Sequence, residues 1–472
     1  MHTKLKNLIK NTKQIFSQEI LDTLAIKSGF IKRKSGKIDG STFLAFNVFL
    51  SGDLCSKSLS TLCARLASNY GISISPQALN ERFNSNAVDF MQSVFATMLF
   101  NQNQTLREQK DNLTFKRIIL NDSTAYSLPD KFYNEFKGSG GSSSASAIKI
   151  QLQYDLLSGN FLCCDLYSGT INDSCYLDEM DKQTLPGDLR LADLGYYKID
   201  YLKKIDSKNA FYISKLKITT ALYVKNSDVK RKKDGSILKS TEYTKIDILE
   251  IIKPLADGEI IELKDIYIGS KKELKNRLII TKLSEESKKT RVKKQLKAVR
   301  PTRGKINDRN TAWTGVNTYI TNIPENIVST NKVHDIYSLR WQIEIMFKVW
   351  KSIFGIDNVK NVKIERFKCF LYGRLIALLL SSQIVFTAKD IISEETLKEI
   401  SVLKSFRIFT EYFSSLKTDI FNNNLKIISI FKDIILSIRR FGMKSKRKGK
   451  ISVKQILNLL KIDKNNFKKL VI

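Results

Sequence analysis

The chain has 472 residues, which is too long for one ordinary hydrophobic core and predicts two to four domains. Hydrophobic residues make up 42% of it, a composition that excludes a disordered protein. The formal net charge of +32 indicates a polyanionic partner, with nucleic acid first and an anionic membrane surface second, and a generic lysine-rich surface as the plain alternative.

The six cysteines and two histidines argue against a zinc site, because no Cys-x-x-Cys spacing occurs and zinc needs clustered sulfur and imidazole ligands. We expect reduced core cysteines in an intracellular protein. The first residues lack the apolar run of a secretory signal. The apolar run at 375–380 is too short to span a bilayer and predicts a buried helix. The expected location is therefore cytoplasmic and nucleoid-associated, with no membrane partner.

Residues 1 to about 110 show helical periodicity and few strand signals. Apolar residues recur three and four apart at 18–25 and 43–50. At 75–83 a serine and a proline precede a further helical run, as at a helix start. These patterns predict a small helical domain, which we expect to contact DNA.

From Phe115 the pattern changes to strands. Apolar and polar residues alternate from Ile148 to Tyr154, and the turn Ser158-Gly159-Asn160 leads into a second apolar run, which together predict a hairpin. The predicted order is strand, hairpin, helix, strand, helix, strand, with the strands at 118–120, 148–154, 161–167, 189–192 and 211–214 and the last helix at 199–205.

Residues from about 218 to 318 predict β-rich segments. Nine lysines and arginines then fall between Lys288 and Lys305, which suits a solvated helix face as well as DNA contact. A single helix is predicted from about 331 to 354, followed by helices to the end, with a basic run at 444–450.

Asp122 and Asp193 each sit at the carboxyl end of an apolar strand-like run. Strand ends can be neighbours in a sheet, and carboxylates there can hold hard divalent cations. Two Mg²⁺ ions roughly 3.5–4 Å apart suit phosphoryl transfer on DNA. An aspartate at a strand end is more often a turn or cap residue, so neither aspartate decides the matter alone.

The predicted helix at 331–354 supplies a third carboxylate. At about 100° per residue, one narrow stripe of its surface carries Tyr337, Arg340, Glu344, Lys348 and Lys351. Arg340 and Glu344 could be an ordinary i, i+4 pair worth a few tenths of a kcal/mol. The combination of three carboxylates in suitable elements with a basic stripe favours a site for metal and phosphate.

The spacing Tyr337-x₂-Arg340-x₃-Glu344-x₆-Lys351 matches the Tyr-Arg-Glu-Lys motif of one large group of bacterial insertion-sequence transposases of the DDE class. The segments around Asp122 (120–124) and Asp193 (192–196) and the strand-like run at 318–324 also look like that family. The resemblance covers roughly residues 115–380.

The resemblance implies a cut-and-paste transposase with an α/β fold. Its ribonuclease H-like mixed sheet with helices would be interrupted by a β-rich insertion and flanked by helical N- and C-terminal domains. The expected segments are a helical DNA-binding domain (1–110), the first part of the core (111–217), the β-rich insertion (218–317), the second part of the core with the glutamate helix (318–380), and a helical region for dimerisation or DNA contact (381–472).

The resemblance also implies roles for single residues. Asp122, Asp193 and Glu344 would be the catalytic carboxylates that hold two Mg²⁺ ions, which Mn²⁺ can replace. Arg340 and Lys351 would contact phosphates of the transposon end. The remaining expected DNA contacts are Tyr337, Lys348, Trp313, Arg291, Lys293, Lys294, Arg300 and Arg303.

Some members of this family pass through a DNA hairpin, where an aromatic residue holds a flipped base. Trp313 and Tyr319 are the candidates, and core packing is the favoured alternative for both. The first positions to inspect, Asn317 and Thr318, are not aromatic.

The function implied is a DNA transposase that binds terminal inverted repeats and catalyses cleavage and strand transfer, with a hairpin intermediate. Its partners would be double-stranded DNA, both transposon ends and target, and a second copy in a synaptic homodimer. The alternatives are a ribonuclease H-like nuclease or resolvase without strand transfer, and an inactive DNA-binding relative.

Overall fold

The computed structural model describes residues 3–32, 37–49, 54–104, 113–141, 143–298, 308–396, 398–421, 426–445 and 451–461. The chain divides into two compact units, each built from separate stretches of sequence. Unit 1 comprises Met1–Gln109, Ser123–Ile171 and Gln342–Lys450, and unit 2 comprises Lys110–Asp122, Asn172–Trp341 and Ile451–Ile472. The segment boundaries expected from the sequence stay predictions.

Unit 1 is mainly helical. Serines start several of its helices: the side chains of Ser17, Ser58 and Ser75 each accept a backbone N–H of the first turn, which offsets a donor that the helix leaves without a partner. Ser75 is followed by Pro76 at the first helical position, as the sequence predicted. The helices of this unit are α1 (Thr3–Ile15), α2 (Gln18–Lys27), α3 (Gly40–Phe49), α4 (Leu59–Tyr70), α5 (Pro76–Arg82), α6 (Ser85–Gln104), α13 (Trp341–Ser352), α14 (Ile364–Glu395), α15 (Val402–Glu411), α16 (Phe413–Asp419) and α17 (Lys426–Phe441).

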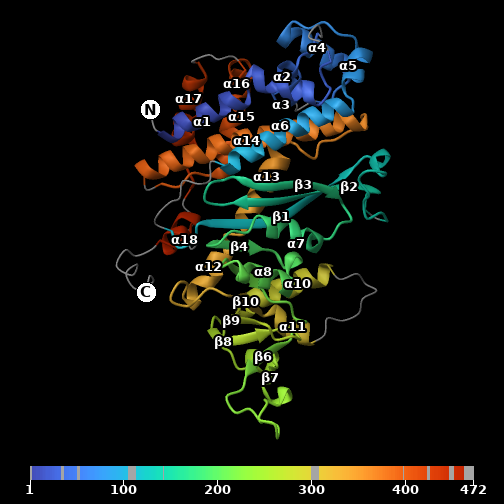
Figure 1. Ribbon diagram of the computed structural model, residues 1–472. Coiled ribbons are helices and arrows are strands. Elements are labelled where there is room, and N and C mark those ends of the chain that lie inside the picture. The colour runs from blue at the N-terminus through green and yellow to red at the C-terminus, as the bar shows by residue number, and fades with distance from the viewer. Residues whose placement is uncertain are drawn as a thin grey trace. The chain divides into compact units, whose positions relative to one another are not determined.

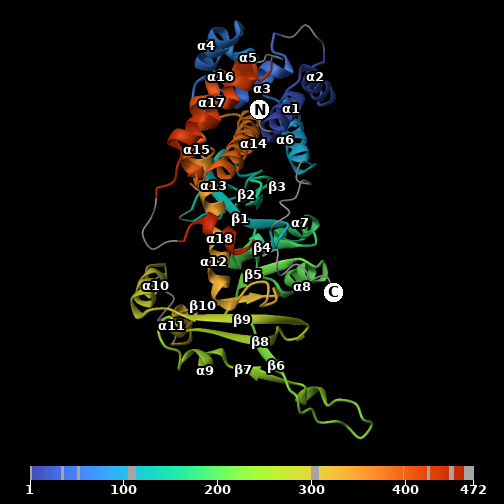
Figure 2. The ribbon, with the colours of Figure 1, turned by 90° about the vertical axis from the view of Figure 1, so that its left-hand side faces the viewer.

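The long helix α14 is the core of unit 1 and runs alongside α6 (Figures 1 and 2). It is long and apolar enough to cross a membrane, but 89% of its most apolar window is buried inside the protein. The run at 375–380 lies within it and is buried, so the predicted buried helix is confirmed.

A hairpin of β2 (Ser146–Asp155) and β3 (Phe161–Ser168) also belongs to unit 1. Its strands are antiparallel, as predicted. Gly159 in the turn has φ 77°, and a Cβ there would lie 2.1 Å from the ring of Phe386 in α14. The turn therefore needs glycine both for its backbone and for the close approach of the helix.

Unit 2 is built on a mixed sheet that starts with the first half of β1 (Arg117–Leu128). The strands β1, β4 and β5 run parallel, and the later strands add to the sheet antiparallel to one another. The order continues from β1 as β4 (Asp188–Ala192), β5 (Phe211–Lys215), β10 (Val316–Thr321), β9 (Leu274–Lys282), β8 (Ile260–Ile268), β6 (Leu222–Lys225) and β7 (Tyr243–Ile246).

Strand β1 contributes residues to both units, and the sheet order begins β3-β2-β1-β4-β5. The β-rich segments predicted after 218 are present as β6 to β9, so the predicted α/β fold class is confirmed. Figure 2 shows this run of strands with α10 and α11 beside β9 and β10. The helices of unit 2 are α7 (Leu177–Lys182), α8 (Ile199–Ser207), α9 (Ile248–Ile252), α10 (Glu285–Ala298), α11 (Asp308–Thr314), α12 (Val333–Ser338) and α18 (Val453–Leu459).

The prediction of one straight helix over 331–354 is wrong. The chain forms α12, a turn at Leu339 and Arg340, and then α13. In the turn the Leu339 and Arg340 N–H groups donate to carbonyls three residues back, a tighter 3₁₀-type pattern. Tyr337 is held by the carbonyl of Ala192 at the end of β4, and Arg340 by Asp122 within β1. We infer that these tertiary contacts outweigh helix propensity here.

Candidate active site

Two predicted carboxylates lie next to each other in unit 2. The parallel pairing of β1 with β4 ends at Asn121 opposite Ala192. Asp122 is the next residue of β1, and Asp193 is the residue that directly follows β4. Neighbouring strands are about 4.8 Å apart, and residues at the same level point to the same face. One expectation needs correction: Asp122 does not end its strand, because β1 continues to Leu128. It lies instead where the pairing with β4 ends.

A buried ion pair at the other end of the two strands holds this register. Arg117, the first residue of β1, lies opposite Asp188, the first residue of β4. The Arg117 guanidinium donates from Nε and Nη2 to the two carboxylate oxygens of Asp188, at 2.8 and 2.6 Å. The Asp188 side chain is fully buried and also accepts the Leu185 N–H at 2.8 Å. This bidentate geometry disfavours a slip of one strand along the other.

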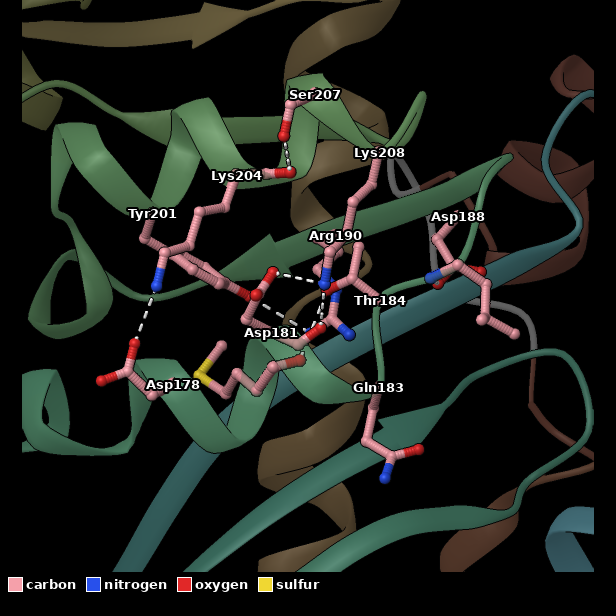
Figure 3. A network of polar contacts seen from close by, with 12 residues as sticks. Asp178, Asp181, Gln183, Thr184, Asp188, Arg190, Tyr201, Lys204, Ser207 and Lys208 are labelled. Atoms are coloured by element: carbon pink, nitrogen blue, oxygen red, sulfur yellow. Dashed lines mark hydrogen bonds and ion pairs between the residues drawn. The ribbon is translucent and has the colours of Figure 1, made fainter.

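A buried arginine of β4, Arg190, lies in a polar network with Tyr201 of α8 (Figure 3). Arg190 of β4 is 2% exposed and donates to the hydroxyl of Tyr201 in α8 at 3.2 Å. Its Nη1 is 3.5 Å from Oδ1 of Asn121, the residue before Asp122. Burial raises the pKa of Tyr201, and the positive charge of Arg190 opposes that rise. The network joins β1, β4 and α8 just before the two aspartates.

The turn between α12 and α13 brings a cation and a tyrosine to the aspartates. Arg340 is 7% exposed, and its Nη1 lies 3.0 Å from Oδ2 of Asp122. The Tyr337 hydroxyl donates to the carbonyl of Ala192, the residue before Asp193, at 3.1 Å. Burial raises the pKa of Tyr337, so its hydroxyl stays protonated at neutral pH and can donate. The structure thus places Tyr337 and Arg340 at the carboxylates, as predicted.

The other motif residues lie on α13, in unit 1. Glu344 is half-buried in the first turn of the helix, Lys348 is exposed, and the Lys351 ammonium donates to the carbonyl of Ala125 at 2.9 Å. Ala125 belongs to the second half of β1, three residues after Asp122. Spaced four and seven residues apart, these three side chains share one face of α13.

The donor set suits a hard divalent cation. Asp122 and Asp193 offer carboxylate oxygens at adjacent positions, and the Asp193 side chain is exposed. Among the described residues, no three histidine, cysteine, aspartate or glutamate side chains gather as a metal site. Glu344, the third carboxylate of the motif, belongs to unit 1, whereas the two aspartates belong to unit 2.

The two aromatic candidates have different surroundings. Tyr319 is 2% exposed, its hydroxyl lies 2.8 Å from Nδ1 of His334, and its ring packs 5.0 Å from that of Tyr337. Trp313 on α11 is half-buried beside an open hollow of about 400 Å³. The hollow is also lined by Leu194, the residue after Asp193. Tyr319 is thus a packing residue, whereas Trp313 keeps a surface that a ligand can reach.

The predicted DNA contacts of the basic segment 288–305 also differ from one another in exposure. Arg291 on α10 donates to Oδ1 of Asn317 at 2.8 Å and to the carbonyl of Val316 at 3.4 Å, so it packs against β10. Lys293 and Lys294 are exposed. Arg300 and Arg303 lie outside the described residues.

The sequence patterns did not predict the residues that align β1 with β4. Arg117 and Asp188 each stand at the start of an apolar run, and opposite charges at matching strand starts are the signal that could have indicated the pairing. Lys215 at the end of β5 was also missed, because a single lysine after a strand carries no pattern of its own.

The chain is similar in sequence to known insertion-sequence transposases. Residues 113–380 match the family model described as a transposase DDE domain, and the chain belongs to this family. It is 50% identical over 465 residues to the transposase for insertion sequence element IS1151 of Clostridium perfringens, covering 98% of each chain. It is 34% identical over 462 residues to the transposase for insertion sequence element IS231B of Bacillus thuringiensis subsp. berliner, covering 96% of each chain.

Among solved structures, a piggyBac transposase synaptic complex with hairpin DNA matches with a TM-score of 0.48 and 12% identity, covering 96% of this chain and 87% of that one. The family assignment confirms the predicted class: the protein is an insertion-sequence DDE transposase, an enzyme of DNA phosphoryl transfer. Proteins of this family bind DNA and generally use divalent metal ions.

Proposed function

We propose that the protein binds the terminal inverted repeats of its insertion sequence and carries out strand cleavage and strand transfer with two Mg²⁺ ions, which Mn²⁺ can replace. Asp122, Asp193 and Glu344 would hold the ions. The observation that carries the proposal is the parallel register of β1 and β4, which sets the two aspartates side by side. When bound, such ions lower the barrier to in-line displacement at phosphorus by stabilising the attacking and leaving oxygens.

The chain's own residues would hold the DNA. Arg340 is held by its ion pair to Asp122, so its guanidinium is oriented before DNA binds and would meet a phosphate next to that carboxylate. Tyr337 lies beside it with a protonated hydroxyl. Lys348 and Lys351 would contact phosphates from the face of α13 that carries Glu344. With these roles the protein would belong to the Tyr-Arg-Glu-Lys group of transposases.

Other contacts would follow the DNA backbone outside the cut. Lys293 and Lys294 are exposed on α10, and such contacts give affinity without reading sequence. Arg291, Arg300 and Arg303 belong to the same proposed DNA surface, as does the N-terminal helical region. Trp313 would touch a base from the hollow beside Leu194.

The assembly would be a homodimer on double-stranded DNA, since two ends must be held together before joining to a target. We place the protein in the cytoplasm, with the nucleoid. A hairpin at the cut end would be the intermediate.

The test is incubation with DNA that carries the element's ends plus Mg²⁺, with product strands resolved on denaturing gels. Nicks, hairpins and joined products, in that order of appearance, are expected. Cuts without joined products would contradict strand transfer and favour a ribonuclease H-like nuclease. Binding without any cleavage would identify an inactive DNA-binding relative.

A further inference from the structure

Lys215 stands in line with the two aspartates of unit 2. Strand β5 runs parallel to β4, with Leu191 opposite Ile213, so two residues further on Asp193 comes opposite Lys215. Asp122 and Asp193 each follow directly on the last pair of β1 with β4, Asn121 opposite Ala192. The register therefore brings the three residues to neighbouring positions at the same edge of the sheet, and the Asp193 carboxylate lies near enough to Lys215 to act on the pKa of its ammonium.

The Lys215 ammonium has no hydrogen-bond or ion-pair partner within the described part of the chain, although the side chain is only half exposed. It does not form an ion pair with Asp193. Other lysines of unit 2 with intermediate exposure do have acceptors: Lys208 contacts Asp181, Lys217 donates to the carbonyl of Tyr197, and Lys288 contacts Glu285. An ammonium that is partly desolvated without an acceptor is unfavourable, and an arriving anion would relieve that cost.

The surroundings of Lys215 are positive. Burial lowers its pKa; Asp193 opposes this, while Arg291 and Arg340 lower the pKa further. Both arginines already have acceptors, Asn317 for Arg291 and Asp122 for Arg340. The Lys215 ammonium lies 5.9 Å from the centre of the Tyr337 ring, near the outer limit of a cation–π contact, so this ring does not replace a hydrogen-bond acceptor.

We propose that Lys215 binds a phosphate of the DNA strand held at Asp193, next to the bond that is cut. Lys215 lies at the end of β5, which pairs with β4 on the side opposite to β1. The residue is therefore on the side of Asp193 that faces away from Asp122. The phosphate oxygens supply the acceptor that Lys215 lacks. The proposal rests on the proposed function, because it takes Asp193 as part of the cleavage site.

The test compares Lys215→Ala, Lys215→Arg and Lys215→Met with Lys245→Ala, an exposed lysine on β7 of the same unit whose loss removes the same charge. Single-turnover cleavage of end DNA with Mg²⁺, with the protein in excess over the DNA, should fall about 10- to 100-fold for Lys215→Ala, the range of a hydrogen bond to a charged group. Lys215→Arg should stay within a few-fold of wild type, and so should Lys245→Ala. Lys215→Met keeps the apolar stem and should match Lys215→Ala.

Substrates with a single uncharged methylphosphonate at each phosphate around the cut locate the contact. One position should reduce cleavage by the wild type and by Lys245→Ala, while Lys215→Met should lose nothing further there. Equal losses for wild type and Lys215→Met at every position would overturn the proposal, as would normal cleavage by Lys215→Met. Asp193→Ala, run in parallel, separates the two claims: normal cleavage by that variant would overturn the proposed function itself.

Discussion

Replacing Arg117 by alanine removes the guanidinium that joins the first residues of β1 and β4. Asp188 is left fully buried, with the Leu185 N–H as the remaining donor that contacts its carboxylate, and Gln183 loses the donor to its carbonyl. Removing one partner of a buried ion pair costs about 3–5 kcal/mol, because the other charge stays desolvated without compensation. We expect a loss of that size in the free energy of opening of β1 and β4.

Hydrogen–deuterium exchange of the amides in β1 and β4 measures this opening directly. A matched control is Lys204→Ala, which breaks an exposed pair with Asp178 and should leave exchange in these strands unchanged. Cleavage of DNA should fall together with protection, because Asp122 and Asp193 depend on the same register. Exchange in Arg117→Ala identical to wild type would refute the argument that this pair holds the strands.

The double variant Arg117→Met with Asp188→Leu tests the physical cause. Apolar residues of similar volume often replace a buried ion pair at little cost. The double variant should therefore recover much of the protection lost in Arg117→Ala. If it is as unstable as the single variant, the unpaired charge is not the reason for the loss.

Three further outcomes follow from the structure. Gly159→Ala should destabilise unit 1 by about 1–3 kcal/mol more than Gly71→Ala in thermal unfolding, because both glycines have positive φ but only Gly159 is pressed against a ring, that of Phe386. The Arg277 guanidinium lowers the pKa of Glu262, so this pair's stabilisation is full above the ordinary glutamate pKa of about 4.3 and is lost as pH falls through the lower folded value. The stability advantage of wild type over Glu262→Gln should accordingly shrink on acidification below about pH 4, and an advantage unchanged by pH would contradict the assignment. With a net charge of +32, DNA affinity should fall steeply between low and physiological salt, and a flat salt titration would count against backbone contact.

Local patterns predicted the elements that carry the site. Alternation marked the β2–β3 hairpin, and apolar runs marked the strands that lead to Asp122 and Asp193. By sequence alone, the ends of these strands could be neighbours. The structure shows that β1 and β4 are neighbours and run parallel. Periodicity reports which face of an element is apolar, and that information is local.

What the sequence could not show depends on contacts between distant residues. The helix over 331–354 breaks at Arg340, where Asp122 holds the side chain 218 residues away in sequence. Arg291 belongs to a basic run, yet it packs on Asn317 and is not free in solvent. Lys215 becomes a candidate only through the register of β1, β4 and β5, and no spacing in the sequence indicates that register.

The most direct test of the central claim is cleavage by Asp122→Asn, Asp193→Asn and Glu344→Gln, with DNA binding measured for each protein. These substitutions keep side-chain volume and remove one carboxylate charge. If the three residues hold the ions, each variant should lose Mg²⁺-dependent cleavage of end DNA while binding that DNA about as tightly as wild type. Near wild-type cleavage by any one of them would contradict the account.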